Sequence, residues 1–230
     1  MMNLRILTLF VWSLLIAACE KNERPAEIVE IGLLLPVSIT PSGRTMQRGD
    51  TLWLEANFSD SLLDKNSGKR YRIRPQDLNL RSSIVYKRLE GIGRLPTGIA
   101  QSFRVVEKVG RAPVGGSTTG LLISVYDGRF YRARIGLIPT QPGITAISML
   151  VSPEGGTSEK YPELPFIQLS PVKGIPQRAV LSNCSYVINE GKATNFDLYS
   201  QHTRAFALEA NPPPVQVDYE LKSTFTVEVK

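Results

Sequence analysis

The side chains best suited to covalent chemistry in this 230-residue chain are two cysteines, Cys19 and Cys184, and one histidine, His202. A cysteine nucleophile needs a nearby base, and a Ser-His-Asp triad would have to use this one histidine. No Gly-x-Ser-x-Gly sequence is present, and a zinc site needs a cluster of Cys, His and carboxylate ligands. We therefore expect Cys184 to be a buried structural thiol and His202 to lie at a helix surface or cap. We expect no catalytic residue, no cofactor and no metal site.

Oxygen-bearing side chains offer two further kinds of chemistry. Asp60, Asp64 and Asn66 suggest a calcium loop, but the bidentate glutamate of an EF-hand is missing, which favours a plain hairpin turn. A glycoside hydrolase needs two carboxylates placed across a cleft. The spacing of the 21 acidic residues singles out no such pair.

The N-terminal segment has the pattern of an export signal. Arg5 is the only charge before residue 19, and an apolar run from Ile6 to Ala18 follows it. A short positive region and an apolar core of this length are typical of a secretory signal, and spanning a membrane takes about 20 residues. Leu15-Ile16-Ala17-Ala18-Cys19 resembles the bacterial lipobox. The resemblance implies that Cys19 becomes the lipidated first residue of the mature chain, which two or more acyl chains anchor stably to a membrane.

The residues after this cysteine indicate where the anchored protein lies. Residues 20–23, Glu-Lys-Asn-Glu, are similar to the signal that sends some Bacteroidota lipoproteins to the cell surface, and no aspartate follows Cys19. We therefore expect an outer-membrane location, with the surface favoured over the periplasmic face. Thr51 and Ser61 each lie between an aspartate and a leucine. Both match the O-glycosylation sequon that Bacteroidota use on exported proteins.

Composition bears on the partners. The formal net charge is +6, but the basic residues are scattered and partly alternate with apolar ones, as on the wet face of a sheet. A nucleic-acid groove needs clustered cations with aromatic platforms, so we expect no nucleic acid partner. Aromatic side chains could stack on sugars if they shared an exposed surface, although in a sheet protein they more often pack in the core. The residues concerned are Trp53, Tyr71, Tyr86, Phe130, Tyr131 and Tyr161.

The elements that must position these residues are mainly strands. Period-two alternation and turn residues predict them over 28–35, 50–58, 71–74, 78–86, 103–109, 121–126, 130–138, 144–151, 166–169, 177–188, 215–221 and 224–229. We expect Pro36 to end the first strand and Asp127-Gly128-Arg129 to form a hairpin turn. Lys222-Ser223 is the predicted turn of a closing hairpin, and a short helix is predicted near 194–204.

Many short strands separated by turns favour a β-sandwich. Residues 132–148 resemble the paired late strands of immunoglobulin-like bacterial domains, although Ile144 stands where many such domains have a tyrosine. As a whole the chain resembles Bacteroidota envelope lipoproteins, through residues 49–54 and 58–62. The expected organisation is a signal peptide over 1–18, a lipidated tether over 19–26 and an immunoglobulin-like β-sandwich over 27–230. The turn-rich residues 110–120 are a candidate internal boundary.

These observations favour a non-enzymatic, lipid-anchored binding or structural module of the cell envelope. Its expected partners are the membrane, through the lipid on Cys19, and an envelope protein or glycan. One alternative is a glycan-binding accessory lipoprotein of a nutrient-uptake system. The other is a glycan hydrolase, which a cleft with two carboxylates roughly 5–10 Å apart would favour.

Overall fold

The computed structural model describes residues 26–75, 82–90, 97–151, 167–202 and 221–230. Within these ranges the protein is mainly β, as predicted. Cys19 and Tyr161 lie outside them, as do the expected signal peptide and nearly all of the expected tether. No helix in the described ranges is long and apolar enough to cross a membrane.

The strands are short except for two, and only brief helical segments accompany them. In chain order the strands are β1 (Glu27–Thr40), β2 (Thr45–Met46), β3 (Leu52–Ser59), β4 (Ser61–Asp64), β5 (Arg70–Arg72), β6 (Ser82–Arg88), β7 (Thr97–Gly98), β8 (Phe103–Val109), β9 (Thr119–Leu122), β10 (Val125–Tyr126), β11 (Phe130–Pro139), β12 (Gly143–Val151), β13 (Ile167–Val172), β14 (Ile175–Ile188) and β15 (Thr224–Val229). The helical segments are η1 (Ala100–Ser102), η2 (Asn189–Gly191) and α2 (Phe196–His202).

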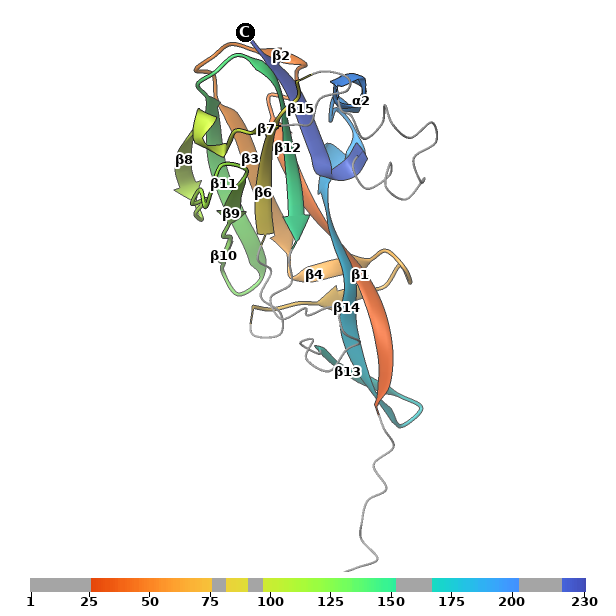
Figure 1. Ribbon diagram of the computed structural model, residues 1–230. Coiled ribbons are helices and arrows are strands. Elements are labelled where there is room, and N and C mark those ends of the chain that lie inside the picture. Colours follow the sequence, from red (N-terminus) through yellow and green to blue (C-terminus); the bar gives the residue numbers. More distant parts are fainter. Residues whose placement is uncertain (1–25, 76–81, 91–96, 152–166, 203–220) are drawn as a thin grey trace, which may run out of the picture.

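The two long strands, β1 and β14, pair in parallel and form the spine of the sheet. On one side of this spine β3 and then β11 follow, with β8 and β10 beside β11; on the other side β12 leads to β6 and β15. Figure 1 shows β1 and β14 running on beyond this body as an arm, with β13 beside β14. The start of β1 lies at the tip of the arm, and the C-terminus lies at the opposite end of the molecule.

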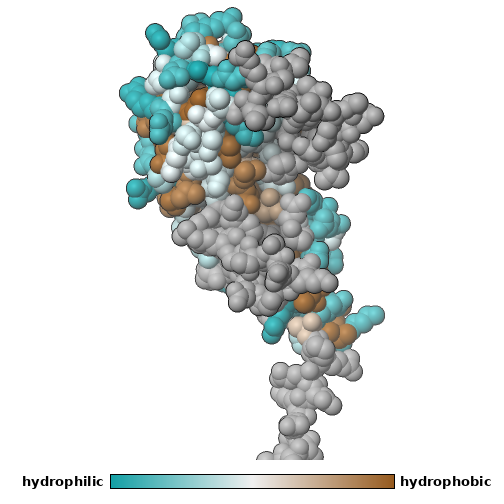
Figure 2. Space-filling view, viewed as in Figure 1, coloured by the Kyte–Doolittle hydropathy of each residue, from teal (hydrophilic) through white to brown (hydrophobic). Residues whose placement is uncertain are grey.

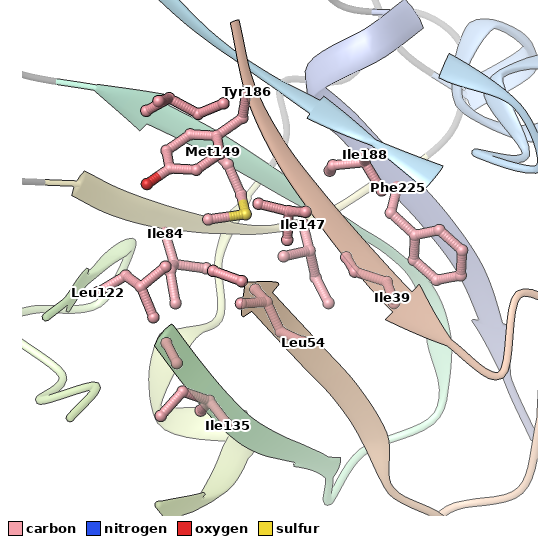
Figure 3. Close-up of a cluster of buried hydrophobic side chains, with 14 of the residues drawn as sticks. Ile39, Leu54, Ile84, Leu122, Ile135, Ile147, Met149, Tyr186, Ile188 and Phe225 are labelled. Carbon is pink, nitrogen blue, oxygen red and sulfur yellow. The ribbon is translucent and has the colours of Figure 1, made fainter. Parts of the chain in front are cut away.

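The core lies between the two groups of strands. Leu54 and Ile135 come from β3 and β11, whereas Ile84, Ile147 and Phe225 come from β6, β12 and β15; all five are buried in one cluster. In Figure 3 these side chains point toward one another from both groups. The alternation in β3 explains this packing, because every second residue from Leu52 to Phe58 is buried.

Several sequence predictions hold. The period-two runs predicted β3 and β8 closely, and Asp127-Gly128-Arg129 does connect β10 to its antiparallel partner β11. The predicted helix is α2, which lies inside the expected range. Its His202 uses Nδ1 to hydrogen-bond the Leu198 carbonyl at 2.9 Å, as expected for a histidine at a helix end.

Other predictions were wrong in detail. Pro36 does not end β1, because β14 still pairs with the strand there and beyond it. Residues 121–126 are not one strand: β9 pairs with β6, and β10 pairs with β11. Lys222 and Ser223 are helical, so they do not form the expected turn, and residues 215–220 lie outside the described ranges. The strands β11 and β12, expected as a pair, join different neighbours.

Candidate functional site

The most distinctive surface feature arises where β3 separates from β1. Residues Val37–Thr40 of β1 pair with β3, and Leu33 and Leu34 pair with β4. Between these ladders, residues Asn57 to Ser59 of β3 pair with β11 and no longer with β1, and the chain then turns into β4. The edge of β1 at Pro36 therefore faces an opening, and a proline fits an edge position because it has no N–H to pair.

This opening is an open groove made of two adjoining hollows, which share Pro36, Asn57 and Glu190. We call it the β1–β3 groove. One hollow has a volume of about 500 Å³ and the other about 510 Å³. The first is mainly apolar, and the second has polar and apolar surface in similar amounts. The additional side chains of the first hollow include Leu34, Leu62, Leu63, Val187 and Arg70, and those of the second include Ser38, Glu55 and Asn189.

A left-handed turn holds the polar rim in place. Asn189, Glu190 and Gly191 have φ values of 50°, 58° and 73°. Asn189 accepts the Ile39 N–H at 2.8 Å and donates its amide to the Ile39 carbonyl at 3.2 Å, so its side chain mimics a neighbouring strand. A glutamate in this conformation costs roughly 1 kcal/mol. Such strain gathers at functional positions in proteins, and here it places Glu190 at the junction of the two hollows.

Two buried aspartates support the far side of the groove. Asp64 accepts N–H groups of Gly32 at 2.7 Å and Ser67 at 3.0 Å, together with the Ser67 hydroxyl at 2.5 Å. Burial alone would raise the pKa of Asp64, but these hydrogen bonds hold it below its usual value. Asp60 accepts hydrogen bonds from Arg72 Nε and the Tyr126 hydroxyl, both at 2.8 Å. These bonds likewise lower the pKa of Asp60 against the opposing effect of burial.

Arginines stack on the aromatic rings beside the groove. The Arg134 guanidinium lies 4.9 Å from the centre of the Trp53 ring and also pairs with Glu55 at 3.0 Å. The guanidinium groups of Arg129 and Arg132 each lie 5.5 Å from the centre of the Phe130 ring. A ring face that already carries a guanidinium is less available for stacking on a sugar.

The other aromatic residues considered for sugar stacking are not on this surface. Tyr86 and Tyr131 are buried in the core, and Tyr71 is half-buried and packs against it. The sequence alone did not separate the buried rings from those on the surface, because an aromatic residue in a β-strand can lie on either face of the sheet.

The other residues singled out from the sequence have scattered positions. Ser61 is half-buried and lines the groove, whereas Thr51 is half-buried just before β3. Cys184 is a buried free thiol, as expected, and burial raises its pKa to about 12. Asp60 and Asp64 serve two different networks, and Asn66 lies in the β4–β5 turn, which Asp64 caps. This agrees with a hairpin turn, and no cluster of three metal-ligating side chains occurs in the described ranges.

The groove itself was not predicted. Asn57 and Glu190 are far apart in the sequence, and only the pairing of β1 with both β3 and β14 brings them together. The one local signal was Pro36 within an otherwise continuous apolar run. Comparison with known proteins adds nothing to this assignment, because no known family model and no curated protein matches the sequence.

Proposed function

We propose that this protein is a lipid-anchored binding module of the bacterial cell envelope, non-enzymatic, with the β1–β3 groove as its ligand site. The observation that carries the proposal is the groove rim, where Asn57 and Glu190 meet from separate segments. A left-handed turn and the two hydrogen bonds of the Asn189 side chain hold that rim in position. A rim preorganised in this way lowers the entropy that a ligand must lose on binding.

The position of β1 supports the anchor. The strand starts at Glu27, only eight residues after the lipobox cysteine. A strand rises about 3.3 Å per residue, so Pro36 lies about 30 Å along β1 from its start. With the lipid on Cys19, the arm formed by β1 and β14 would hold the groove away from the membrane surface and within reach of other envelope components. We keep the outer membrane as the proposed location, with the surface favoured.

The packing of the body supports an immunoglobulin-like sandwich as the proposed fold type. Side chains from β3 and β11 meet those of β6 and β12 across a shared core. The parallel spine of β1 and β14 links the two groups of strands. An experimental structure in which these groups form two separate layers would support this assignment, whereas one open layer would contradict it.

A glycan ligand is the second candidate, and the polar side chains of the second hollow favour it. Asn57, Glu55 and Glu190 offer amide and carboxylate groups of the kind that hydrogen-bond sugar hydroxyls. The carboxylates of Glu55 and Glu190 also bear on the hydrolase alternative. A general acid in a glycosidase is kept protonated by an apolar setting, whereas Glu190 is exposed and the Glu55 side chain is 40% exposed and paired with Arg134. This setting favours binding over hydrolysis.

Photo-crosslinking from the groove tests the proposed site. A photoreactive residue replaces Asn57 in the full chain in cells, and a matched control carries it at the exposed Gln141, in the β11–β12 turn. We expect a light-dependent adduct from position 57 only, and we expect Glu190→Arg to remove it. Equal adducts from both positions, or an adduct that Glu190→Arg leaves unchanged, would refute the groove as the binding site.

A glycan array separates the two versions of the proposal. The probe is the full chain in detergent, applied to immobilised bacterial and host glycans. Retention that falls at least tenfold in Asn57→Ala identifies a glycan ligand. Adducts to a protein without any glycan retention would instead identify a protein partner.

A further inference from the structure

A second surface, on the same sheet face as the β1–β3 groove but on the other side of β11, is exposed and aliphatic. Leu121 lies in β9, Val125 lies in β10 and Ile123 lies between them; they are 39%, 51% and 45% exposed, respectively. Val109, at the end of β8, is 39% exposed. We call these four residues the aliphatic stripe. Figure 2 shows apolar surface gathered over this part of the body.

Backbone pairing places the stripe on one face. Val109 lies opposite Arg134, and Val125 lies opposite Arg132, along the same edge of β11. Gly110 then turns the chain so that Arg111 pairs with Ile123 in an antiparallel bridge. This turn requires glycine: φ is 75°, and a Cβ at Gly110 would lie 2.4 Å from the Ile123 carbonyl oxygen.

Arg111 gives the stripe a chemical preference. It is exposed and lies directly opposite Ile123, and no carboxylate in the described part of the chain pairs with it. The neighbouring Arg132 and Arg134 are different, because they pair with Asp127 and Glu55 at 3.0 Å each. A partner that covers the aliphatic side chains would also remove water from Arg111. Burying a cation without a counter-charge is strongly unfavourable, so that partner has to supply an anionic group, which in a protein segment is a carboxylate.

We propose that the aliphatic stripe docks a protein segment in which an aspartate or glutamate is flanked by aliphatic side chains. The carboxylate pairs with Arg111, and the aliphatic side chains cover Ile123 and its neighbours. This inference does not depend on the groove or on the lipid anchor. It concerns the strands on the other side of β11 from the groove, and a different kind of ligand.

A displayed peptide library tests the docking preference. The bait is the full chain with Cys19→Ser, which removes the expected acyl acceptor, so that the anchor cannot influence the result. We expect enriched peptides to carry Asp or Glu beside Val, Ile or Leu. We expect them to bind at least tenfold more weakly to Ile123→Asp. Selection on Arg111→Glu should instead enrich Lys or Arg at the central position.

The matched control is Val172→Asp, at another aliphatic residue that is 50% exposed but lies in β13, away from the stripe. It should leave peptide binding unchanged, and equal thermal midpoints would show that the variants are folded. Enrichment without acidic residues, or no reversal in Arg111→Glu, would overturn the proposal. The proposal would also be overturned if Ile123→Asp left peptide binding unchanged but reduced self-association in sedimentation, which would indicate a second copy as the occupant. The same holds if the variant reduced only flotation with phosphatidylglycerol vesicles, which would indicate a lipid surface.

Discussion

Replacing the buried Asp64 by alanine should destabilise the protein more than replacing any exposed turn aspartate. The parallel register of β1 and β14 shifts between Ile31 and Gly32, and at this irregularity the Gly32 N–H donates to Asp64 rather than to a strand. Asp64→Ala leaves this buried N–H without an acceptor. It also removes the acceptor for Ser67, which lies in the following turn.

The expected loss is about 2–4 kcal/mol. A buried donor without a partner costs about 1–3 kcal/mol, and hydrogen bonds to a charged group contribute about 1.5–3 kcal/mol each. The turn residues can recover part of that loss by bonding to water. Asp127 is the matched control, because it also accepts two backbone N–H groups in a turn but is exposed. Asp127→Ala should cost less than about 1 kcal/mol.

Urea unfolding of the full chain, followed by circular dichroism, measures both variants. Equal slopes of the unfolding free energy against urea would show that the two transitions are comparable. If Asp64→Ala loses no more stability than Asp127→Ala, the Asp64 network does not hold β1 to the β4–β5 hairpin, and this account of the groove wall is wrong.

Three further predictions concern titration and buried groups. Folding lowers the pKa of Asp60 and of Asp64, so their contribution is full above the unfolded value of about 3.9 and is lost as pH falls through the lower folded values. The urea concentration at the unfolding midpoint should therefore decrease as the pH falls below about 4, and it should decrease less steeply in Asp64→Asn. An equally steep decrease in that variant would contradict this prediction. Cys184 should resist a thiol reagent at pH 8 in the folded protein, because burial raises its pKa to about 12. After denaturation one thiol per mature chain should react if Cys19 is acylated, and two would contradict acylation. The buried Tyr86 hydroxyl has no hydrogen-bond partner in the described ranges. Tyr86→Phe should therefore unfold at an equal or higher urea concentration, whereas a loss above about 1 kcal/mol would reveal a hidden partner.

Local patterns in the sequence predicted individual strands well. The alternation from Leu52 to Phe58 reports burial of one face, which is a property of the strand itself. Pro36 misled the prediction, because whether a proline interrupts a strand depends on which edge its nitrogen faces and on where the neighbouring strands pair. Residues 121–126 were read as one strand for a similar reason. A continuous run of strand-forming residues does not show that the pairing partner changes from β6 to β11.

The candidate site depended on tertiary structure that no short pattern contains. Glu190 reaches the groove because the left-handed turn follows β14, and Asn57 reaches it because β3 separates from β1. The chemically conspicuous residues, Cys184 and His202, had predictable structural positions and lie outside the groove lining. Residue type therefore predicted an anchor motif, and pairing topology revealed the groove.

The most direct test of the central claim is the mass of the N-terminal peptide of the mature protein, released by protease from purified membranes. A lipid-anchored module predicts that this peptide begins at Cys19 and carries diacylglycerol on sulfur, and that Cys19→Ser abolishes both the modification and the retention in membranes. An unmodified mature peptide that begins elsewhere, with Cys19→Ser still retained in membranes, would contradict the account.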